Sequence, residues 1–454
     1  MWAVPDAGDV LSGQFTYPER LEIRPFVGKL SATVNVPGSK SVTNRALILS
    51  ALMARHGPRI LTGALRSEDT EVMLACLARL GFEFVPLWNI HQIGVGRNKS
   101  RSVIPAASAD LFVANSGTTM RFLTAMVSLG TGRYRLDGVP RMRERPIQDL
   151  LDTLAGPLGV PAKSEQNNGC PPIEIEGTGR WSAGMISVRS SVSSQFLSGL
   201  LLAAPFAGVE VDIRPDGDSV SEPYVEMTVR MLQSWMCDVT RTVDGYHVRP
   251  IKSNIGGPHR YTIEPDASAA SYFWAAAAIL GGRVTVSGLT EHSLQGDVRF
   301  VDLLQQMGCR VEKCEAGITV HGGPLRGVDV DMNAISDTVM TLAAVACFAE
   351  GPTRIRNVAH IRHKETDRIA ALATELRRLG AEIEEFPDGL AITPRPLHGA
   401  EVETYNDHRM AMSLALIGLK VPGVVIKNPG CVAKTYPGFW EDLERTSPQS
   451  PVPS

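Results

Sequence analysis

The residues best suited to chemistry lie in the stretch HKETDRIAALATELRRLG, residues 363–380, where charged groups precede an apolar pattern. Apolar side chains recur at helical spacing in its second half and Gly380 ends the run, so the pattern predicts a helix. One turn back along this apolar seam lies Glu365, between Lys364 and Arg368, so the pattern predicts that Glu365 belongs to the first turn of this helix. A carboxylate between two cations could transfer a proton beside a bound anion. The alternative is structural, because acids stabilise helix N-termini and basic neighbours are often solvated partners.

Similar polar clusters precede other predicted helices, and many of them contain cations. Helix N-termini expose unpaired backbone N–H groups and a positive dipole end, which together bind anions. Arginine adds bidentate contacts to phosphate or carboxylate, whereas lysine acts as a movable point charge. Converging on one cleft, such cations would suit substrates that carry several phosphates and carboxylates. The cations at these positions are Lys40, Arg45, Arg121, Arg141, Arg145, Lys364, Arg368, Arg409 and Lys434.

Two acidic residues stand among these cations and are the candidates for proton transfer. Asp337 opens the helical pattern SDTVMT, and Glu365 belongs to the stretch described above. Carboxylates in a cationic cleft stay ionised unless buried, and near a reacting atom they can exchange protons. A helix cap is the structural alternative for Asp337. The acids expected to cap helices or pair with arginines instead are Glu264, Asp266, Asp297 and Asp407.

Composition excludes several other classes of function. The chain has 454 residues and a net charge of -3, which predicts neither nucleic-acid nor membrane binding. The segment GSKS lacks P-loop spacing, and the absence of an H-E-x-x-H motif or a Cys/His cluster argues against a metal site. The seven cysteines form no C-x-x-C pair, and the N-terminus has no secretory or transit pattern. These two features favour a cytoplasmic protein with reduced thiols.

The elements that must position these residues form a repeat. Six apolar helix patterns end in glycines spaced by 70 to 78 residues: Gly57, Gly130, Gly208, Gly281, Gly351 and Gly423. A second helix pattern follows each, and strand-like alternation follows most of the second helices. Two independent markers with one period indicate six copies of a unit with two helices and several short strands. We infer an α/β (α+β) fold with two domains of three units, a linker at 253–260 and a disordered tail at 443–454.

Ten segments, in order over residues 22–442, resemble the 5-enolpyruvylshikimate-3-phosphate (EPSP) synthase family. They include PGSKSVTNRALILSALMA, NSGTTMRFLTA, GVPRMRERPIQDLLDTL, EPDASAASYF, KETDRIAALATELRRLGAE and YNDHRMAM. As a set these motifs are highly specific, although NSGTT alone is a weak signal. The resemblance implies two similar domains of three βαβαββ units each, an inside-out α/β barrel, with the active site in the interdomain cleft. It implies a first domain of residues 1–38 and 262–454 and a second of residues 39–261.

The resemblance also implies a reaction. The enolpyruvyl group of phosphoenolpyruvate would pass to the 5-hydroxyl of shikimate 3-phosphate, giving EPSP and phosphate through a tetrahedral intermediate. This step belongs to the shikimate pathway of aromatic amino-acid biosynthesis. The family needs no metal, no organic cofactor and no covalent enzyme intermediate. The expected partners are therefore the two small-molecule substrates, without nucleic acid or membrane, and a monomer is expected.

Carried over by motif position, the resemblance implies two substrate sites. The shikimate 3-phosphate site would comprise Lys40, Ser41, Arg45, Ser193, Ser194, Gln195, Ser221, Tyr224, Asp337, His360 and Lys364. The phosphoenolpyruvate site would comprise Lys40, Asn115, Gly117, Arg141, Gln195, Arg368, Arg409 and Lys434. Asp337 and Glu365 would be the proton-transfer pair, with Lys40 assisting. We expect Asp337 to deprotonate the hydroxyl and Glu365 to serve C3, but the sequence leaves open which carboxylate serves which step.

The chain departs from a common family pattern at Ser116, Phe122 and His360, where many members have Ala, Pro and Asn. The first two positions flank the loop beside which the family's inhibitor glyphosate binds, so inhibitor sensitivity stays open. Gly117, between them, is retained and leaves room for the ligand. His360 could donate to the substrate phosphate, and binding would then vary with pH.

Two alternative functions remain on sequence grounds. The sister enzyme that transfers enolpyruvyl to UDP-N-acetylglucosamine has the same fold but usually carries a reactive cysteine on a loop of the second unit. Here no cysteine lies between Cys76 and Cys170, and the KETDR and PRMRERP motifs are of the shikimate type. A non-catalytic anion-binding module is the other alternative, but it would not need Asp337 and Glu365 beside the cations.

Overall fold

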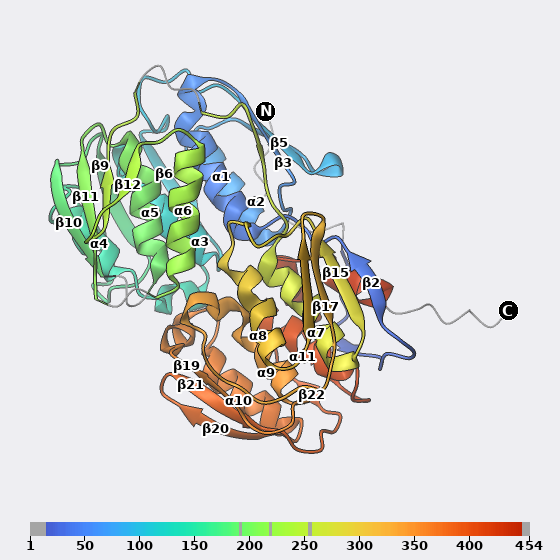
Figure 1. Ribbon diagram of the computed structural model, residues 1–454. Coiled ribbons are helices and arrows are strands. Elements are labelled where there is room, and N and C mark those ends of the chain that lie inside the picture. The colour runs from blue at the N-terminus through green and yellow to red at the C-terminus, as the bar shows by residue number, and fades with distance from the viewer. Residues whose placement is uncertain (1–14, 190–192, 218–219, 253–256, 447–454) are drawn as a thin grey trace. The chain divides into compact units, whose positions relative to one another are not determined.

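The computed structural model describes residues 15–189, 193–217, 220–252 and 257–446, which form two compact units (Figure 1). Unit 1 comprises Gly38–Ile263, and unit 2 comprises the described residues up to Pro37 together with those from Glu264 onward. The chain therefore leaves unit 2 once and returns to it once. Within the predicted linker, residues 253–256 lie outside the described residues, as do residues 447–454 of the predicted tail.

Unit 1 contains three four-stranded sheets with one topology. In each, the first two strands are parallel and the next two neighbours are antiparallel. The strand orders are β14 (Arg260–Thr262), β3 (Arg59–Thr62), β5 (Gln92–Val95), β4 (Phe84–Leu87); β6 (Ser108–Phe112), β7 (Thr131–Asp137), β9 (Ile173–Thr178), β8 (Ala162–Ser164); and β10 (Gly184–Arg189), β11 (Val211–Asp216), β13 (Tyr246–Val248), β12 (Val239–Arg241). Strand β14, from the end of the unit, completes the sheet that begins with β3.

Unit 2 repeats this arrangement. Two of its sheets have the same four-stranded order, and in the third the N-terminal strand supplies the antiparallel neighbour. The orders are β2 (Ser31–Val34), β15 (Arg283–Ser287), β17 (Gly317–His321), β16 (Arg310–Cys314); β18 (Asp329–Asp331), β19 (Thr353–Arg356), β21 (Gly389–Thr393), β20 (Glu382–Phe386); and β22 (Glu401–Val402), β23 (Val425–Lys427), β1 (Arg20–Glu22). Five four-stranded sheets of one topology, with a three-stranded sheet that keeps the parallel pair and one antiparallel neighbour, confirm the repeat and the predicted α/β class.

The first helix of each repeat lies in the interior of its unit. These helices are α1 (Lys40–Leu52), α3 (Gly117–Val127) and α5 (Ser194–Ala203) in unit 1, and α7 (Ala267–Leu280), α9 (Val339–Ala346) and α11 (His408–Gly418) in unit 2. Within each set, every helix contacts the other two. A helix surrounded by protein must be apolar all round, and α7, with the sequence ASAASYFWAAAAIL, is buried at every position except Leu280. Gly281 then ends this helix with φ 70°.

The second helices are amphipathic and leave one side exposed. They are α2 (Glu68–Arg79), α4 (Gln148–Ala155), α6 (Glu222–Ser234), α8 (Phe300–Gln306), α10 (Arg368–Arg378) and α12 (Phe439–Arg445). In α10 the predicted seam is buried at Ile369, Leu372 and Leu376, while Arg377 and Arg378 face outward. Helix α12 extends three residues into the segment for which disorder is predicted. Among the described residues, no helix has the length and apolar content needed to cross a membrane.

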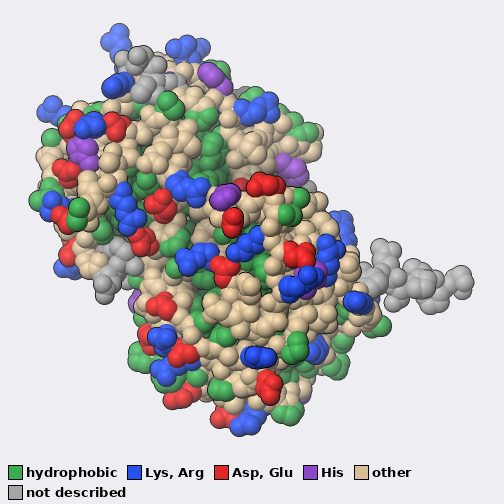
Figure 2. Space-filling view, viewed as in Figure 1, with side chains coloured by type: hydrophobic (Ala, Val, Ile, Leu, Met, Phe, Trp, Pro, Cys, Tyr) green, Lys and Arg blue, Asp and Glu red, His purple; other side chains and the backbone are tan. Residues whose placement is uncertain are grey.

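The charge is mixed on the face of the molecule that Figure 2 shows. On the face in Figure 2, basic and acidic side chains are interspersed over both units rather than gathered by sign. This agrees with the small net charge of -3. The cations at the helix starts therefore matter as local concentrations and not as part of a general positive field.

Candidate active site

In unit 1 the predicted lysine stands at the start of α1. Ser39 caps this helix by accepting from Val42 N, so Lys40 occupies its first position. The Lys40 ammonium lies 3.4 Å from a carboxylate oxygen of Asp69, and both side chains are largely buried. Asp69 belongs to the first turn of α2 and was not predicted as a site residue. The acid-rich sequence RSEDTE was its only signal.

Arg45, four residues into α1 from Ser41, is a buried cation with neutral partners. Its Nε donates to Thr228 Oγ1 over 2.8 Å, and its terminal nitrogens donate to the carbonyls of Ser41 and Tyr224, each over 3.0 Å. Among the described residues, no carboxylate forms an ion pair with Arg45. Burial lowers the pKa of the guanidinium to about 10, which leaves it charged at neutral pH. A positive charge without a protein counter-ion is suited to a substrate anion.

The Arg45 guanidinium also stacks on an aromatic ring. Its Cζ lies 5.1 Å from the centroid of the Phe122 ring, within the range of a cation–π contact. Phe122 is buried on α3, so this contact joins α1 to the helix that follows the NSGTT loop. The departure at position 122 therefore acts on a predicted shikimate 3-phosphate residue.

The remaining predicted polar residues of unit 1 lie at other helix starts. Ser193 caps α5 by accepting from Gln195 N over 3.2 Å, and Ser194 follows as its first residue. The Gln195 amide donates to Thr118 Oγ1 over 3.3 Å, which joins the starts of α5 and α3. Ser221 occupies the cap position of α6 in the left-handed backbone region, with φ 55°.

The start of α3 is shaped by an arginine that sequence reasoning did not place in the substrate sites. Arg145 is buried, and its guanidinium donates to Asn115 O over 3.4 Å. It lies so close to Gly117 that a Cβ on this glycine would stand 2.4 Å from the Arg145 Nη2. Arg141, the arginine predicted for phosphoenolpyruvate, has a side chain one-third exposed and pairs with the exposed Glu144 over 2.7 Å.

Arg121 fixes the loop that carries Arg145. It is buried on α3 and donates to Pro146 O over 2.9 Å and to Met142 Sδ over 3.3 Å. These acceptors flank Arg145 on both sides, in and after the 3-10 helix η3 (Pro140–Glu144). Arg121 thus serves as a support for this loop, a role that its position in NSGTTMR does not reveal.

In unit 2 the KETDR stretch differs from its prediction in one respect. Helix α10 begins at Arg368, because the Asp367 carboxylate caps it by accepting from Ala370 N over 3.1 Å. The expectation that Glu365 occupies the first turn is therefore wrong. Lys364 and Glu365 lie in the connection between α10 and the 3-10 helix η7 (Ala359–His363), which turns Glu365 back toward Arg368.

Arg368 is the centre of the polar cluster in unit 2. Its Nε and Nη2 donate to the two oxygens of Asp407 over 2.8 and 3.2 Å. Nη2 also donates to Glu365 over 2.9 Å, and Nη1 donates to Asp337 over 3.4 Å. Burial lowers the pKa of this guanidinium, but the carboxylates of Asp407, Glu365 and Asp337 outweigh burial and raise it overall. One buried, charged arginine thus holds both predicted proton-transfer carboxylates.

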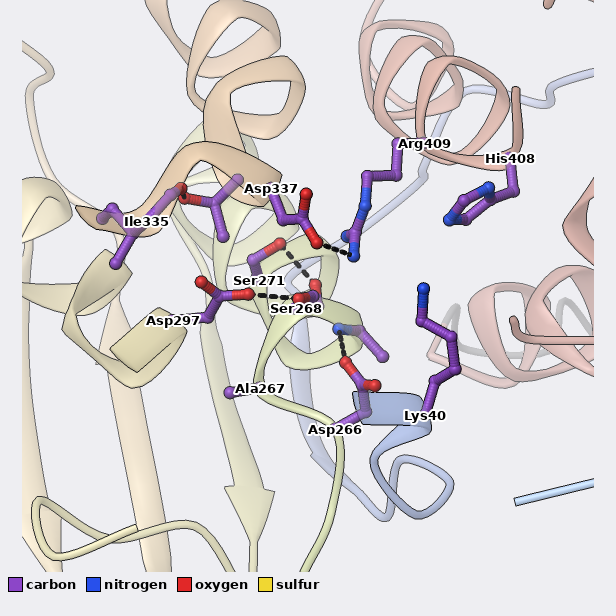
Figure 3. A network of polar contacts seen from close by, with 12 residues as sticks. Lys40, Asp266, Ala267, Ser268, Ser271, Asp297, Ile335, Asp337, His408 and Arg409 are labelled. Carbon is purple, nitrogen blue, oxygen red and sulfur yellow. Dashed lines mark hydrogen bonds and ion pairs between the residues drawn. The ribbon is translucent and has the colours of Figure 1, made fainter. Parts of the chain in front are cut away.

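A second arginine, on helix α11, forms an ion pair with Asp337. Arg409 Nη2 donates to Asp337 over 2.7 Å, as Figure 3 shows. Asp337 lies in the 3-10 helix η6 (Asn333–Thr338), which is kinked at Ile335, and the cap position of the following helix α9 is held by Thr338. Two guanidiniums on one carboxylate favour its ionised form.

The other predicted residues of unit 2 are also buried or nearly so. Lys434 ends the 3-10 helix η8 (Pro429–Lys434) and is 4% exposed. His360 lies in η7 and is 7% exposed. Burial and the neighbouring Lys364 lower the pKa of His360 to about 3, so the ring is neutral at neutral pH. The contact of His360 with a substrate phosphate stays a prediction.

The acids expected to be structural have structural contacts. Asp266 and Asp407 cap α7 and α11 by accepting from Ala269 N and Arg409 N. Asp297 accepts from Ser268 near the start of α7, as seen in Figure 3. The Glu264 carboxylate accepts from the backbone and side chain of Gln295.

Comparison with known proteins identifies the family. The profile of EPSP synthase (3-phosphoshikimate 1-carboxyvinyltransferase) matches residues 26–443. The chain belongs to the EPSP synthase family. A 3-phosphoshikimate 1-carboxyvinyltransferase of Nostoc punctiforme is 48% identical over 93% of this chain and 98% of the relative. The enzyme of that name from Aeromonas salmonicida is 43% identical over 94% of this chain and 99% of the relative.

Solved structures agree with this EPSP synthase assignment. The EPSP synthase of Acinetobacter baumannii superposes with a TM-score of 0.78 at 25% identity, covering 95% of this chain and 98% of that one. The enolpyruvyl transferase NikO of Streptomyces tendae reaches a TM-score of 0.74 at 20% identity, covering 94% and 97%. At that identity the second likeness concerns the fold alone, the two-domain inside-out α/β fold of EPSP synthases.

Proposed function

We propose that this protein transfers the enolpyruvyl group of phosphoenolpyruvate to the 5-hydroxyl of shikimate 3-phosphate, releasing inorganic phosphate. Family membership supports this reaction and its place in the shikimate pathway. The observation that carries the proposal in the structure is the sharing of Arg368 by Asp337 and Glu365. An anion-binding module needs cations, but it does not need two carboxylates held beside them.

The addition step requires a base and an acid. The 5-hydroxyl oxygen bonds to C2 of phosphoenolpyruvate, its proton goes to a base, and C3 gains a proton. We assign the base to Asp337, because Arg368 and Arg409 favour its ionised form. Glu365 is then the acid that gives the proton to C3. Lys40 assists by neutralising charge near the reacting groups, and Asp69 holds its ammonium.

The elimination step reverses the proton transfer at C3. The bond from C2 to the phosphate oxygen breaks, C3 returns a proton to Glu365, and phosphate leaves with the bonding electrons. Cations placed in advance stabilise the charge that develops on the leaving phosphate. We assign this task to Arg368, Arg409 and Lys434. Each is at least 95% buried, so little side-chain freedom is lost when the anion binds.

For the remaining phosphoenolpyruvate ligand we favour Arg145 over Arg141. Arg145 is buried against Gly117 at the start of α3, where its guanidinium and the backbone N–H groups can act on one anion. Arg141 pairs with an exposed glutamate instead. We also assign Asn115, whose backbone carbonyl accepts from Arg145, to the phosphoenolpyruvate site.

The shikimate 3-phosphate ligands are assigned as the sequence predicts. Arg45 supports this assignment most strongly, since it is a buried cation with neutral partners. The proposed set is completed by Lys40, Ser41, Ser193, Ser194, Gln195, Ser221, Tyr224, Asp337, His360 and Lys364. His360 would contact the substrate phosphate, and in the ligand-free protein burial and Lys364 lower the pKa of its ring to about 3.

The proposed assignments draw on both units. We take residues 39–261 as one catalytic domain and the remainder as the other, and the boundaries of unit 1, Gly38–Ile263, support this division. We further propose a monomer that acts in the cytoplasm. The seven cysteines, all within the described residues, are free thiols, which supports a reducing compartment.

The test is phosphate release from phosphoenolpyruvate, with shikimate 3-phosphate and UDP-N-acetylglucosamine as parallel acceptors. We expect release only with shikimate 3-phosphate. Asp337→Asn and Glu365→Gln should each lower kcat by about 10²-fold or more, because each removes a proton-transfer group. Asp329→Asn, which changes an exposed aspartate paired with Arg356, is the matched control and should retain wild-type turnover. Absence of release with either acceptor from folded protein would overturn the proposal.

A further inference from the structure

The turn that precedes α11 holds two consecutive residues in the left-handed backbone region. Tyr405 has φ 53° and Asn406 has φ 54°, and Asp407 N donates to Thr404 O over 2.8 Å. This is a tight turn with positive φ at both central positions, which favours glycine and asparagine and strains a bulky residue. Tyr405 can therefore keep this conformation only where other contacts hold it.

The residue after this turn controls two of the cations in unit 2. Asp407 caps α11 by accepting from Arg409 N over 2.9 Å. The same carboxylate accepts from Arg368 through both of its oxygens. The position of Asp407 thus fixes the first turn of α11 and the plane of the Arg368 guanidinium. A shift in the turn would be passed to both arginines.

A buried glutamate holds the turn from α10. Glu375 is fully buried, and its Oε1 accepts from the Tyr405 hydroxyl over 2.7 Å. Its Oε2 accepts from Glu403 N over 3.1 Å and pairs with Arg378 over 3.0 Å. Burial and the Glu375 carboxylate raise the pKa of Tyr405 to about 12, so the hydroxyl remains a donor at neutral pH.

The geometry of α10 makes these contacts a pair. Arg368 and Glu375 are seven residues apart and lie on one face of the helix. Arg368 contacts Asp407, at the end of the turn. Glu375 contacts Tyr405, within the turn, and Glu403, just before the turn. One rigid helix face thereby sets both ends of the strained turn.

We propose that Glu375, acting through the Tyr405 hydroxyl, is a positioning residue that orients Arg368 and Arg409 toward phosphoenolpyruvate. This inference rests on the proposed function for the identity of the ligand. Glu375 needs no contact with the substrate in this role. The strain in the turn makes the hydroxyl contact necessary, since without it the turn can relax and Asp407 can move.

The test compares Tyr405→Phe with Arg378→Met. The first removes the hydroxyl contact and keeps the ring. The second removes the exposed partner of Glu375, which also donates to Glu401 O, and leaves the Tyr405 hydroxyl contact in place. We expect Tyr405→Phe to raise the KM for phosphoenolpyruvate about fivefold or more, with the KM for shikimate 3-phosphate within about twofold. Arg378→Met should leave both values unchanged. Glu375→Gln keeps an acceptor for the Tyr405 hydroxyl but loses the acceptor for Glu403 N. Its KM for phosphoenolpyruvate should therefore lie between those of the other two variants.

A readout without turnover separates this inference from the proposed function. The Arg368 Nε–H resonance, identified by its loss in Arg368→Lys, should shift in ligand-free Tyr405→Phe and stay in place in Arg378→Met. An unchanged resonance and unchanged KM in Tyr405→Phe would overturn the inference, as would a lower melting temperature as the sole effect. If the wild-type protein shows no turnover, the proposed function fails, and the resonance still decides whether Glu375 positions Arg368. Should Glu375→Gln not fold, Tyr405→Phe alone decides.

Discussion

The Arg145 guanidinium lies against Gly117 with no room for a side chain between them: a Cβ on Gly117 would stand 2.4 Å from Nη2 and 2.9 Å from Cζ. Gly117 has an ordinary helical backbone at the start of α3, so the requirement for glycine comes from this approach and not from φ. Any larger residue must push the guanidinium away. In the proposed site, that movement changes how phosphoenolpyruvate is held.

Gly117→Ala should therefore weaken phosphoenolpyruvate binding while the protein stays folded. Arg145 is a flexible side chain, so it can yield without disturbing α3, but its charge-assisted contacts to the substrate are lost or lengthened. We expect the KM for phosphoenolpyruvate to rise about tenfold or more, with the KM for shikimate 3-phosphate nearly unchanged. Steady-state kinetics with each substrate varied in turn measure both values. Equal rises in the two KM values would contradict this explanation.

Two of the three arginines of the PRMRERP segment, Arg141 and Arg145, provide a matched pair. Arg145→Ala removes a buried cation at the start of α3 and should raise the KM for phosphoenolpyruvate about 100-fold. Arg141→Ala removes a partly exposed partner of Glu144 and should change it by less than about threefold. The kinetics of both variants, measured side by side, decide which arginine belongs to the site. The reverse order would restore the assignment made from sequence.

The choice between Arg141 and Arg145 could not be made from the sequence. The family motif places three arginines in seven residues, and nothing local tells which of them points inward. The answer depends on the 3-10 helix η3 and on Arg121, which anchors Met142 and Pro146 from another helix. The six repeats, in contrast, could be read directly, because closing glycines and fully apolar helices are local signals that recur with a period.

The same limit applies to α10. Its apolar seam predicts the buried face correctly, yet the helix begins at Arg368 rather than near Glu365, because the Asp367 side chain caps it. Glu375 within the charged run TELRR has the pattern of a solvated residue. It is fully buried because the strained turn at Tyr405 supplies its hydrogen-bond donor. A contact between segments thirty residues apart leaves no trace in the spacing of either.

Replacing Phe122 should change the affinity of the protein for the acceptor substrate, shikimate 3-phosphate. The ring faces the Arg45 guanidinium at 5.1 Å, a contact that Phe122→Leu removes and Phe122→Tyr retains. A cation–π contact contributes about 0.5–2 kcal/mol, so the Kd for shikimate 3-phosphate should rise about two- to thirtyfold in the leucine variant. Calorimetric titration of the three proteins gives the comparison. Identical affinities in all three would mean that the ring only fills space.

His360 should make folding stability depend on pH. Burial, followed by the charge of Lys364, lowers the pKa of the folded-state ring to about 3, below the unfolded value of about 6.5. Between these values the unfolded chain binds a proton that the folded protein does not. The stability contribution is therefore fully present above about pH 6.5 and is lost as the pH falls toward 3. From pH 7 to pH 5 the wild-type protein should lose up to about 2 kcal/mol relative to His360→Asn.

Denaturant unfolding of the wild-type and His360→Asn proteins at the two pH values measures this difference directly. NMR titration of the His360 ring in the folded protein is the independent control, and it should show no protonation above pH 5. The same reasoning predicts that the Kd for shikimate 3-phosphate does not follow the titration of a histidine between pH 6 and 8. A midpoint near 6.5 for this ring, or a parallel loss of stability in both proteins, would show that Lys364 and burial do not keep it neutral.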